Sequence, residues 1–276
     1  MVEERIEEYS FVSDGIPVKI KITRREGEFV PLYLVEVPKV DEKTRAIMEE
    51  IREKLITKVP IRTFEAIDQT TMESMKRNFY FSAVNALSKR LRGVSTARIK
   101  ALAGFIIHEM LGLGDIEILL QDDSLEEIVI NSSKEPVWVY HRKYGWLKTN
   151  IRVKSELQIE NYASSIGRKV GRQITILNPL MDAHLMSGDR VNATLFPIST
   201  CGNTITIRKF RRKPWTITDL IGNKTINFEV AALLWFAIQY EASIIVAGGT
   251  ASGKTTMLNT FACFIPPNQR IISVEE

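Results

Sequence analysis

The residues most suited to chemistry form a glycine-rich segment near the C-terminal end of the sequence. They fit the pattern G-x-x-x-x-G-K-[ST] and run Gly248, Gly249, Thr250, Ala251, Ser252, Gly253, Lys254, Thr255 and Thr256. Glycines let successive main-chain N–H groups point inward, and the start of a following helix adds partial positive charge. The segment therefore predicts a phosphate-binding loop. In it Lys254 would bridge the β- and γ-phosphates of a nucleotide, and Thr255 would bind Mg²⁺.

The flanking residues predict the elements that hold this loop. Apolar residues from Ser243 to Ala247 indicate a strand before it, and a helix from Lys254 to Phe264 follows. A second strand is expected from Arg270 to Val274, which gives the opening of a parallel βαβ unit. Upstream, the apolar residues from Phe228 to Tyr240 predict a buried helix.

Glu275 and Glu276 directly follow the second predicted strand. The carboxyl ends of strands in such a sheet face the ligand, so one of these glutamates is a candidate for orienting an attacking water. Solvated charges at a strand end are the alternative. A sheet of this kind needs further strands, because two alone leave exposed edges and an uncovered face. We therefore expect the sequence to be the front, truncated portion of a longer protein. We expect that this chain alone does not hydrolyse a nucleotide.

Before residue 214 the hydrophobic pattern predicts two further parts. Residues 9–37 alternate as short antiparallel strands do, and helices are expected after Asp41, from about Thr63 to Arg92, and after Ser95. Strand-like runs then surround a helix capped by Ser155. The expected fold class is α/β, with a helical and β N-terminal region (1–94), an α+β domain (95–214) and the start of a RecA-like P-loop NTPase domain (215–276).

Composition indicates an ordinary soluble globular protein. The chain has 276 residues, 45% hydrophobic and 25% charged, with a formal net charge of +4. Its longest apolar run, Val230 to Ile238, is shorter than the roughly 20 residues of a membrane-spanning helix. The acidic N-terminus lacks the order of a signal peptide, so a cytoplasmic location is expected. Cys201 and Cys263 are expected to be unlinked thiols.

Three other features leave alternatives open. The run from Arg208 to Lys213 carries five cations in six positions and suits phosphate, nucleic acid, an acidic neighbour or a plain solvated linker. Nucleic acid is not expected as a partner, because no DNA-binding motif accompanies the run. Histidines lack the spacing of metal ligands; they are His108, His141 and His184, the last expected in a loop. Aromatic residues of one hairpin predict cross-strand packing or a docking surface; they are Trp138, Tyr140, Tyr144 and Trp146.

The loop resembles that of the type II and type IV secretion ATPase superfamily. Within it, the chain is most similar to the archaeal branch that drives pilus and archaellum assembly. The resemblance rests on the loop, on Met257-Leu258-Asn259, and on residues 270–276. Upstream, four stretches are similar to the N-terminal domain of that branch: residues 125–131, 137–147, 188–193 and 204–210.

This resemblance implies a homo-hexameric ring at the inner face of the membrane. ATP would lie between N-terminal and C-terminal domains, whose relative rotation pushes on a membrane platform protein. Glu275 would belong to the acidic box, with Glu276 in place of a more usual aspartate. Arginines that match the phosphate-contacting stretches are Arg190, Arg208 and Arg211. Ala251 replaces a common glycine, which requires a negative φ.

The sequence thus supports an ATP-binding, Mg²⁺-dependent motor subunit for filament assembly or secretion. A nucleotide-dependent assembly module without hydrolysis is the alternative from another class. A DNA-translocating P-loop ATPase is the third reading, which salt-sensitive DNA binding would favour.

Overall fold

The computed structural model covers residues 1–276 and describes residues 3–57, 69–185, 187–210, 213–249 and 252–274. The chain divides into two units, Met1–Phe210 and Arg211–Glu276. Mixed α/β structure is confirmed as the fold class, because a large sheet with covering helices makes up the first unit. The three-part division expected from the sequence stays a prediction.

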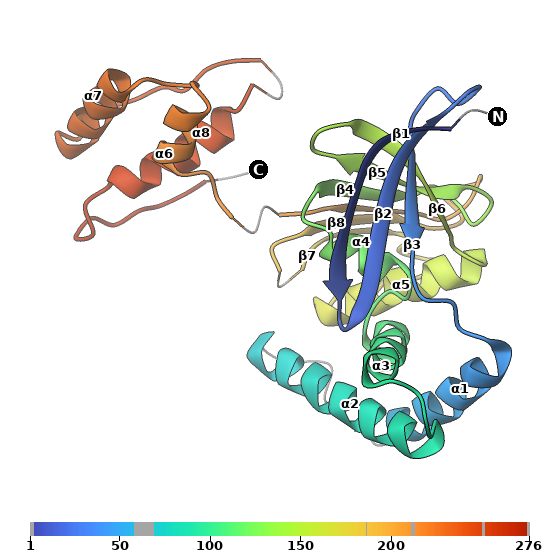
Figure 1. Ribbon diagram of the computed structural model, residues 1–276. Helices are drawn as coiled ribbons and strands as arrows, with labels where there is room; N and C mark the ends of the chain where they lie inside the picture. The colour runs from blue at the N-terminus through green and yellow to red at the C-terminus, as the bar shows by residue number, and fades with distance from the viewer. Residues whose placement is uncertain (1–2, 58–68, 186, 211–212, 250–251, 275–276) are drawn as a thin grey trace. The chain divides into compact units, whose positions relative to one another are not determined.

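In the described part of the first unit, nine strands form one sheet (Figure 1). Their order is β1-β2-β3-β6-β5-β4-β9-β8-β7. β3 and β6 pair in parallel, whereas the other neighbours in the described sheet are antiparallel. The strands are β1 (Glu3–Ser13), β2 (Ile16–Arg25), β3 (Leu32–Glu36), β4 (Leu125–Ile130), β5 (Pro136–His141), β6 (Gly145–Arg152), β7 (Leu180–His184), β8 (Arg190–Thr194) and β9 (Thr204–Arg208).

Alternation of side chains fixes which face of the sheet is buried. In β2 the side chains of Val18, Ile20 and Ile22 are buried, and the lysines between them point to the other face. Lys19 lies 2.7 Å from Glu8, and Lys21 lies 2.7 Å from a glutamate of β3. The antiparallel start predicted for residues 9–37 is therefore confirmed, because a period of two suits a half-buried sheet.

Three helices contribute side chains to the core beside the sheet: α3 (Thr96–Leu111), α4 (Ile116–Gln121) and α5 (Glu156–Lys169). Ser95 caps α3 by accepting from the N–H of Arg98, and Ser155 caps α5 by accepting from the N–H of Gln158. Both caps were expected from the sequence. Ile159 and other apolar residues of these helices join the sheet core, and each fully buried side chain contributes about 1.5–3 kcal/mol.

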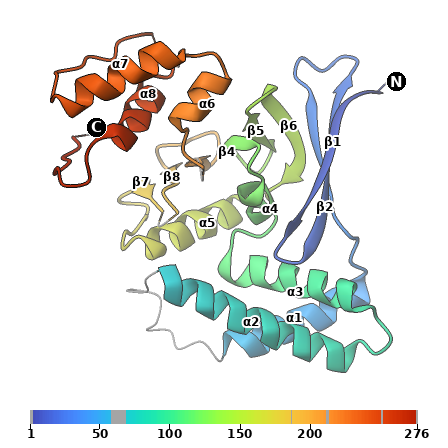
Figure 2. The same ribbon diagram turned by 60° about the vertical axis from the view of Figure 1, so that its left-hand side comes forward.

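A second core lies among α1 (Glu42–Ile56), α2 (Gln69–Arg90) and α3 (Figure 2). Asp41 caps α1 by accepting from the N–H of Thr44. Ala83 and Leu87 of α2 are fully buried against α3, in the helix that the sequence predicts here. Its predicted start at about Thr63 lies outside the described residues. Helix α3 therefore belongs to both cores and joins the sheet to the helices.

The turn between β1 and β2 connects the sheet to these helices. It consists of Asp14, with φ +48°, and Gly15, with φ +85°. Asp14 Oδ2 accepts hydrogen bonds from His108 Nε2 at 2.9 Å, Gln121 Nε2 at 2.6 Å and Lys76 Nζ at 2.7 Å. The turn therefore docks on residues of α2, α3 and α4.

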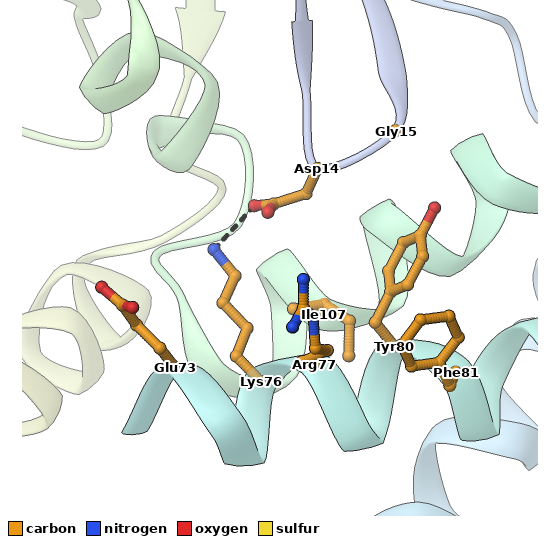
Figure 3. A pocket seen from close by; sticks show the side chains of 8 residues that line it. All are labelled: Asp14, Gly15, Glu73, Lys76, Arg77, Tyr80, Phe81 and Ile107. Atoms are coloured by element: carbon orange, nitrogen blue, oxygen red, sulfur yellow. Dashed lines mark ion pairs between the residues drawn. The ribbon is translucent and has the colours of Figure 1, made fainter. Parts of the chain in front are cut away.

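A pocket of about 510 Å³ lies beside this turn (Figure 3). Lys76 and Arg77 come from α2, as do Tyr80 and Phe81, and the Lys76 side chain reaches across to Asp14. Burial by itself raises the pKa of Asp14, but the hydrogen bonds from His108 and Lys76 outweigh it and hold that pKa well below its usual range.

The second unit contains α6 (Ile217–Gly222), α7 (Phe228–Gln239), α8 (Lys254–Phe261) and a 3₁₀ turn, Ala262–Phe264. The strands predicted at Ser243–Ala247 and Arg270–Val274 are not formed, because neither segment has a partner strand among the described residues. Ile245 is 92% exposed and Val274 is 93% exposed. An apolar run becomes a strand only when a neighbouring ladder satisfies its main chain.

Helix α7 forms where the sequence predicts it, but the expectation that it is buried was wrong. Within it only Ala231 is buried among the described residues. Its apolar side chains need a sheet face to cover them, and no strand of the second unit forms one within the described part of the chain. None of the described helices combines the length and apolar character that a membrane crossing requires.

Candidate phosphate-binding loop and arginine pair

Gly253 sets the start of α8 through its main-chain conformation. It occupies the N-cap position before Lys254 with φ +89°, in the left-handed region that residues with a Cβ rarely adopt. A glycine reaches this conformation without steric cost. This conformation explains why the sequence pattern has a glycine at its second fixed glycine position, Gly253.

Lys254 is the first residue of α8, and its side chain folds back over the loop. Nζ donates to the carbonyl oxygen of Gly248 at 2.8 Å and to that of Gly249 at 2.5 Å. Both acceptors are neutral, and Lys254 forms no ion pair among the residues that the structure describes. An ammonium held by carbonyl groups keeps its charge uncompensated and therefore attracts an anion strongly.

The two loop glycines differ in how much space surrounds them. A Cβ on Gly248 would lie 2.5 Å from Ser252 Oγ, whereas a Cβ on Gly249 would meet nothing within 4 Å. Ser252 therefore packs against Gly248 so closely that a larger residue there would displace it. A side chain at 248 would require the Ser252 hydroxyl to rotate away, whereas Gly249 has no such neighbour.

The first turn of α8 presents main-chain N–H groups that no described side chain caps. Thr255 in this turn is exposed, as a metal-binding hydroxyl would need to be, and Thr256 is half-buried. The carbonyl of Thr256 accepts from the buried Thr260 Oγ1 at 2.7 Å, and this hydroxyl also reaches the carbonyl of Trp215 at 3.4 Å. The helix is thereby anchored to the segment before α6, and its first turn can receive an anion.

Some predicted site residues have no structural account. They lie outside the described residues: Thr250, Ala251, Arg211, Glu275 and Glu276. The φ expected of Ala251 and the position of the acidic box therefore stay predictions.

The two remaining predicted arginines lie next to each other in the first unit. Arg190 of β8 is the register partner of Arg208 of β9, and both side chains are exposed. Arg190 makes a bidentate pair with Asp182 of β7, from Nε to Oδ1 at 3.1 Å and from Nη2 to Oδ2 at 2.6 Å. The hydrogen bonds and charge of Arg190 hold the pKa of Asp182 below its usual range.

The sequence reasoning missed Asp182 and placed His184 in a loop. Both belong to β7, whose residues alternate between exposed and buried, with Met181 and Ala183 in the core. This alternation of period two was the signal that predicts a strand. It was hard to recognise because Asp and His are uncommon in strands and the run is short.

The two described cations at the start of the basic run, Arg208 and Lys209, have different surroundings. Arg208 is exposed on the sheet face, whereas Lys209 Nζ donates to the carbonyl oxygen of Asp122. The N–H of Phe210 donates to Asp189 Oδ1 at 2.6 Å. The start of the run is therefore tied to the sheet and its loops rather than being a plain solvated linker.

The aromatic hairpin packs across its two strands, as expected. Tyr140 and Trp146 are register partners of β5 and β6, and their rings meet edge to face with centroids 5.3 Å apart. His141 and His108 are both buried, and Cys201 and Cys263 are unlinked and exposed. These residues have structural roles or none in the candidate site.

A glycine loop that runs into a helix, in a chain of mixed α/β fold, is typical of P-loop proteins. Residues 110–276 match the family described as type II/IV secretion system protein, and this chain belongs to that family. The match includes the loop, both described arginines and Asp182.

Individual relatives are also similar to this chain. The chain is 35% identical to the uncharacterized protein MJ0781 of Methanocaldococcus jannaschii, over 99% of this chain and 37% of the relative. It is 34% identical to MJ0900 of the same organism, over 85% of this chain and 42% of the relative. It is 27% identical to the type IV secretion system protein PtlH of Bordetella pertussis, over 57% of this chain and 52% of PtlH.

A solved structure, the VirB11 ATPase from the Brucella suis type IV secretion system in complex with sulphate, is also similar. The TM-score is 0.36 at 22% sequence identity, over 56% of this chain and 52% of VirB11. The chain thus spans about two fifths of the length of MJ0781 and MJ0900 and about half that of PtlH.

Proposed function

We propose that the chain is the ATP-binding portion of a motor subunit that powers assembly of a pilus-like or archaellum filament, or a related secretion machine. The observation that carries the proposal is the geometry of Lys254, whose ammonium has only neutral carbonyl partners among the described residues, at the start of α8. Phosphate oxygens are stronger acceptors than these carbonyls, so a bound triphosphate would draw Nζ away from the loop.

The residues present fit a nucleotide with Mg²⁺. The uncapped first turn of α8 supplies N–H donors, Gly248 and Gly253 give the loop its close turn, and the Thr255 hydroxyl is exposed beside them. Magnesium, when bound, would neutralise phosphate charge, and Thr255 is the residue of this chain that would hold it. Glu275 and Glu276 stay the proposed acidic residues that orient water.

Arg190 and Arg208 are proposed as contacts that compensate the charge of the phosphates. Their register pairing on an exposed sheet face supports this role, because two guanidinium groups side by side suit a multiply charged anion. Arg211 is proposed as a third contact from the sequence alone. In the functional protein these groups and the loop would act in a hexameric ring at the inner face of the membrane, against a platform protein.

The finer assignment to the archaeal filament branch is a proposal that rests on the resemblance of the loop and of residues 270–276 to that branch. MJ0781 and MJ0900 come from Methanocaldococcus jannaschii, an archaeon, and are more similar to this chain than PtlH is. This chain matches 37% of MJ0781 and 42% of MJ0900, so these relatives are longer than the matched part. The full activity of a motor is therefore proposed of the whole protein and not of this chain alone.

Calorimetric titration of Mg-ATP into the chain tests the proposal. We expect saturable binding that Lys254→Ala weakens by at least about a hundredfold, because the ammonium is the main cation of the loop. Lys43→Ala removes one exposed lysine of α1 and serves as the matched control, with affinity unchanged. Equal affinity in the wild-type and Lys254→Ala chains would contradict nucleotide binding at this loop.

Phosphate release distinguishes the motor from an assembly module. Turnover that is lost in Lys254→Ala favours a motor whose catalytic residues are already present. Binding without turnover favours a module that needs further residues for hydrolysis.

A further inference from the structure

Two arginines face each other across neighbouring strands of the described sheet. Arg190 of β8 and Arg208 of β9 are register partners, and both are exposed. Like charges directly opposite each other destabilise a sheet. A carboxylate beside these side chains reduces this repulsion.

Asp182 of β7 holds one of the two arginines. Its carboxylate accepts from Nε and Nη2 of Arg190, at 3.1 Å and 2.6 Å. Two parallel hydrogen bonds fix the plane of a guanidinium group as well as its position. Arg190 therefore has a defined orientation although half of its side chain is exposed.

This pairing uses one edge of the guanidinium group. Both bonds to Asp182 involve the Nε and Nη2 edge of Arg190, so they leave Nη1 unused. Nη1 has no hydrogen-bond partner within the described chain. A guanidinium has five N–H groups. The Nη1 end can therefore still donate to a phosphate while Asp182 stays bound.

The main chain beneath Asp182 is also fixed. β7 is the edge strand of the described sheet, and Arg172 Nη1 donates to the carbonyl oxygen of Asp182. Edge strands are otherwise short of hydrogen-bond partners on one side. The carboxylate that orients Arg190 thus lies on an anchored strand.

We propose that Asp182 is a positioning residue that holds Arg190 in one orientation, with its Nη1 end left to donate to a phosphate group of a nucleotide. The proposal rests on the proposed function, in which Arg190 compensates phosphate charge. Without Asp182, Arg190 regains rotamer freedom and turns away from Arg208, so nucleotide binding must order it. The carboxylate also repels phosphate, but at this exposed position solvent and salt screen the repulsion, and positioning outweighs it.

Titration of Mg-ATP into the full chain tests this role. We expect Asp182→Ala to weaken binding about threefold to tenfold. Asp182→Asn keeps an acceptor oxygen and should retain most of the affinity. Arg190→Ala should weaken binding at least as much as Asp182→Ala. The double variant should match Arg190→Ala alone, because Asp182 acts through Arg190.

Glu36→Ala is the control, since Glu36 is a carboxylate of the same sheet that pairs with Lys21 at 2.7 Å. The Glu36→Ala chain should bind Mg-ATP with unchanged affinity. Its melting temperature should equal that of the Asp182→Ala chain. Positioning predicts that the loss in Asp182→Ala is largest for ATP and smallest for AMP. A merely structural role would weaken the binding of ATP, ADP and AMP equally.

Two outcomes overturn the proposal: tighter Mg-ATP binding by Asp182→Ala, or additive losses in the double variant. If the wild-type chain binds no Mg-ATP, the proposed function fails, and inorganic tripolyphosphate titrated into Lys254→Ala then decides the role of Asp182. If the further change Asp182→Ala weakens tripolyphosphate binding in the Lys254→Ala chain, the positioning role of Asp182 is supported. Unchanged, tighter or undetectable binding in this background overturns it.

Discussion

Lys76 and Lys254 each lie beside a glycine-containing turn, in different units, and their partners differ in charge. Lys76 Nζ lies 2.7 Å from the carboxylate of Asp14, which also accepts from a histidine and a glutamine. Lys254 Nζ is bound to the neutral carbonyls of Gly248 and Gly249. The first lysine completes a structural network with a carboxylate, whereas the second has neutral partners among the described residues.

This difference shows how the surroundings of a lysine indicate its role. The polar network at Asp14 is satisfied on several sides and joins the β1–β2 turn to three helices. Satisfied networks of this kind contribute to stability and are damaged by the loss of one member. A lysine bound only to its own loop contributes little to folding. We therefore expect stability to depend on Asp14 and ligand binding to depend on Lys254.

The largest effect is expected for Asp14→Ala, which should lower the free energy of unfolding by about 3 kcal/mol. It leaves Lys76, Gln121 and the buried His108 without their acceptor, and alanine is strained at φ +48°. Asp14→Asn tolerates this φ and keeps an acceptor, so it should cost about 1 kcal/mol. Urea unfolding measures both. A loss in Asp14→Ala of less than about 1 kcal/mol would show that the network is not structural.

Acid should produce an intermediate effect. The folded-state pKa of Asp14 lies below its ordinary value of 3.8, so the unfolded chain binds more protons in this range. The stability that Asp14 contributes is complete above about pH 5 and is lost as the pH falls from about 4 through the folded-state pKa. The difference in unfolding free energy between wild type and Asp14→Asn should therefore narrow below about pH 4. A difference that is constant across this range would contradict the shifted pKa.

The smallest effect on stability is expected for Lys254→Ala, below about 0.5 kcal/mol. Water can replace the ammonium at the carbonyls of Gly248 and Gly249, because both glycines are exposed. Thermal or urea unfolding of the variant measures this directly. A loss as large as that of Asp14→Ala would give the two lysines the same structural role and remove the distinction between them.

Local sequence predicted the starts of several helices correctly. Asp41, Ser95 and Ser155 each accept from the N–H three residues further on, as cap residues do. The alternation in β2 and the hairpin of β5 and β6 were also predicted. These features depend on neighbours within a few positions, so the chain encodes them locally.

Features that depend on partners distant in sequence were not predictable in the same way. Apolar residues predicted strands at 243–247 and 270–274, and these did not form because no partner strand lies beside them in the described chain. The burial expected of α7 failed for the same reason. The Asp14 network was also missed, because its donors lie on three helices.

The sequence by itself predicted a phosphate-binding loop, since glycine conformation and a lysine at the helix start follow from residue types at fixed spacing. It also identified Arg190 and Arg208 as candidates. Only the tertiary structure decided that these two are register partners and that Asp182 orients one of them, because strand pairing sets which residues meet. Chemistry encoded in one segment can be read locally, whereas chemistry assembled from three strands requires the sheet.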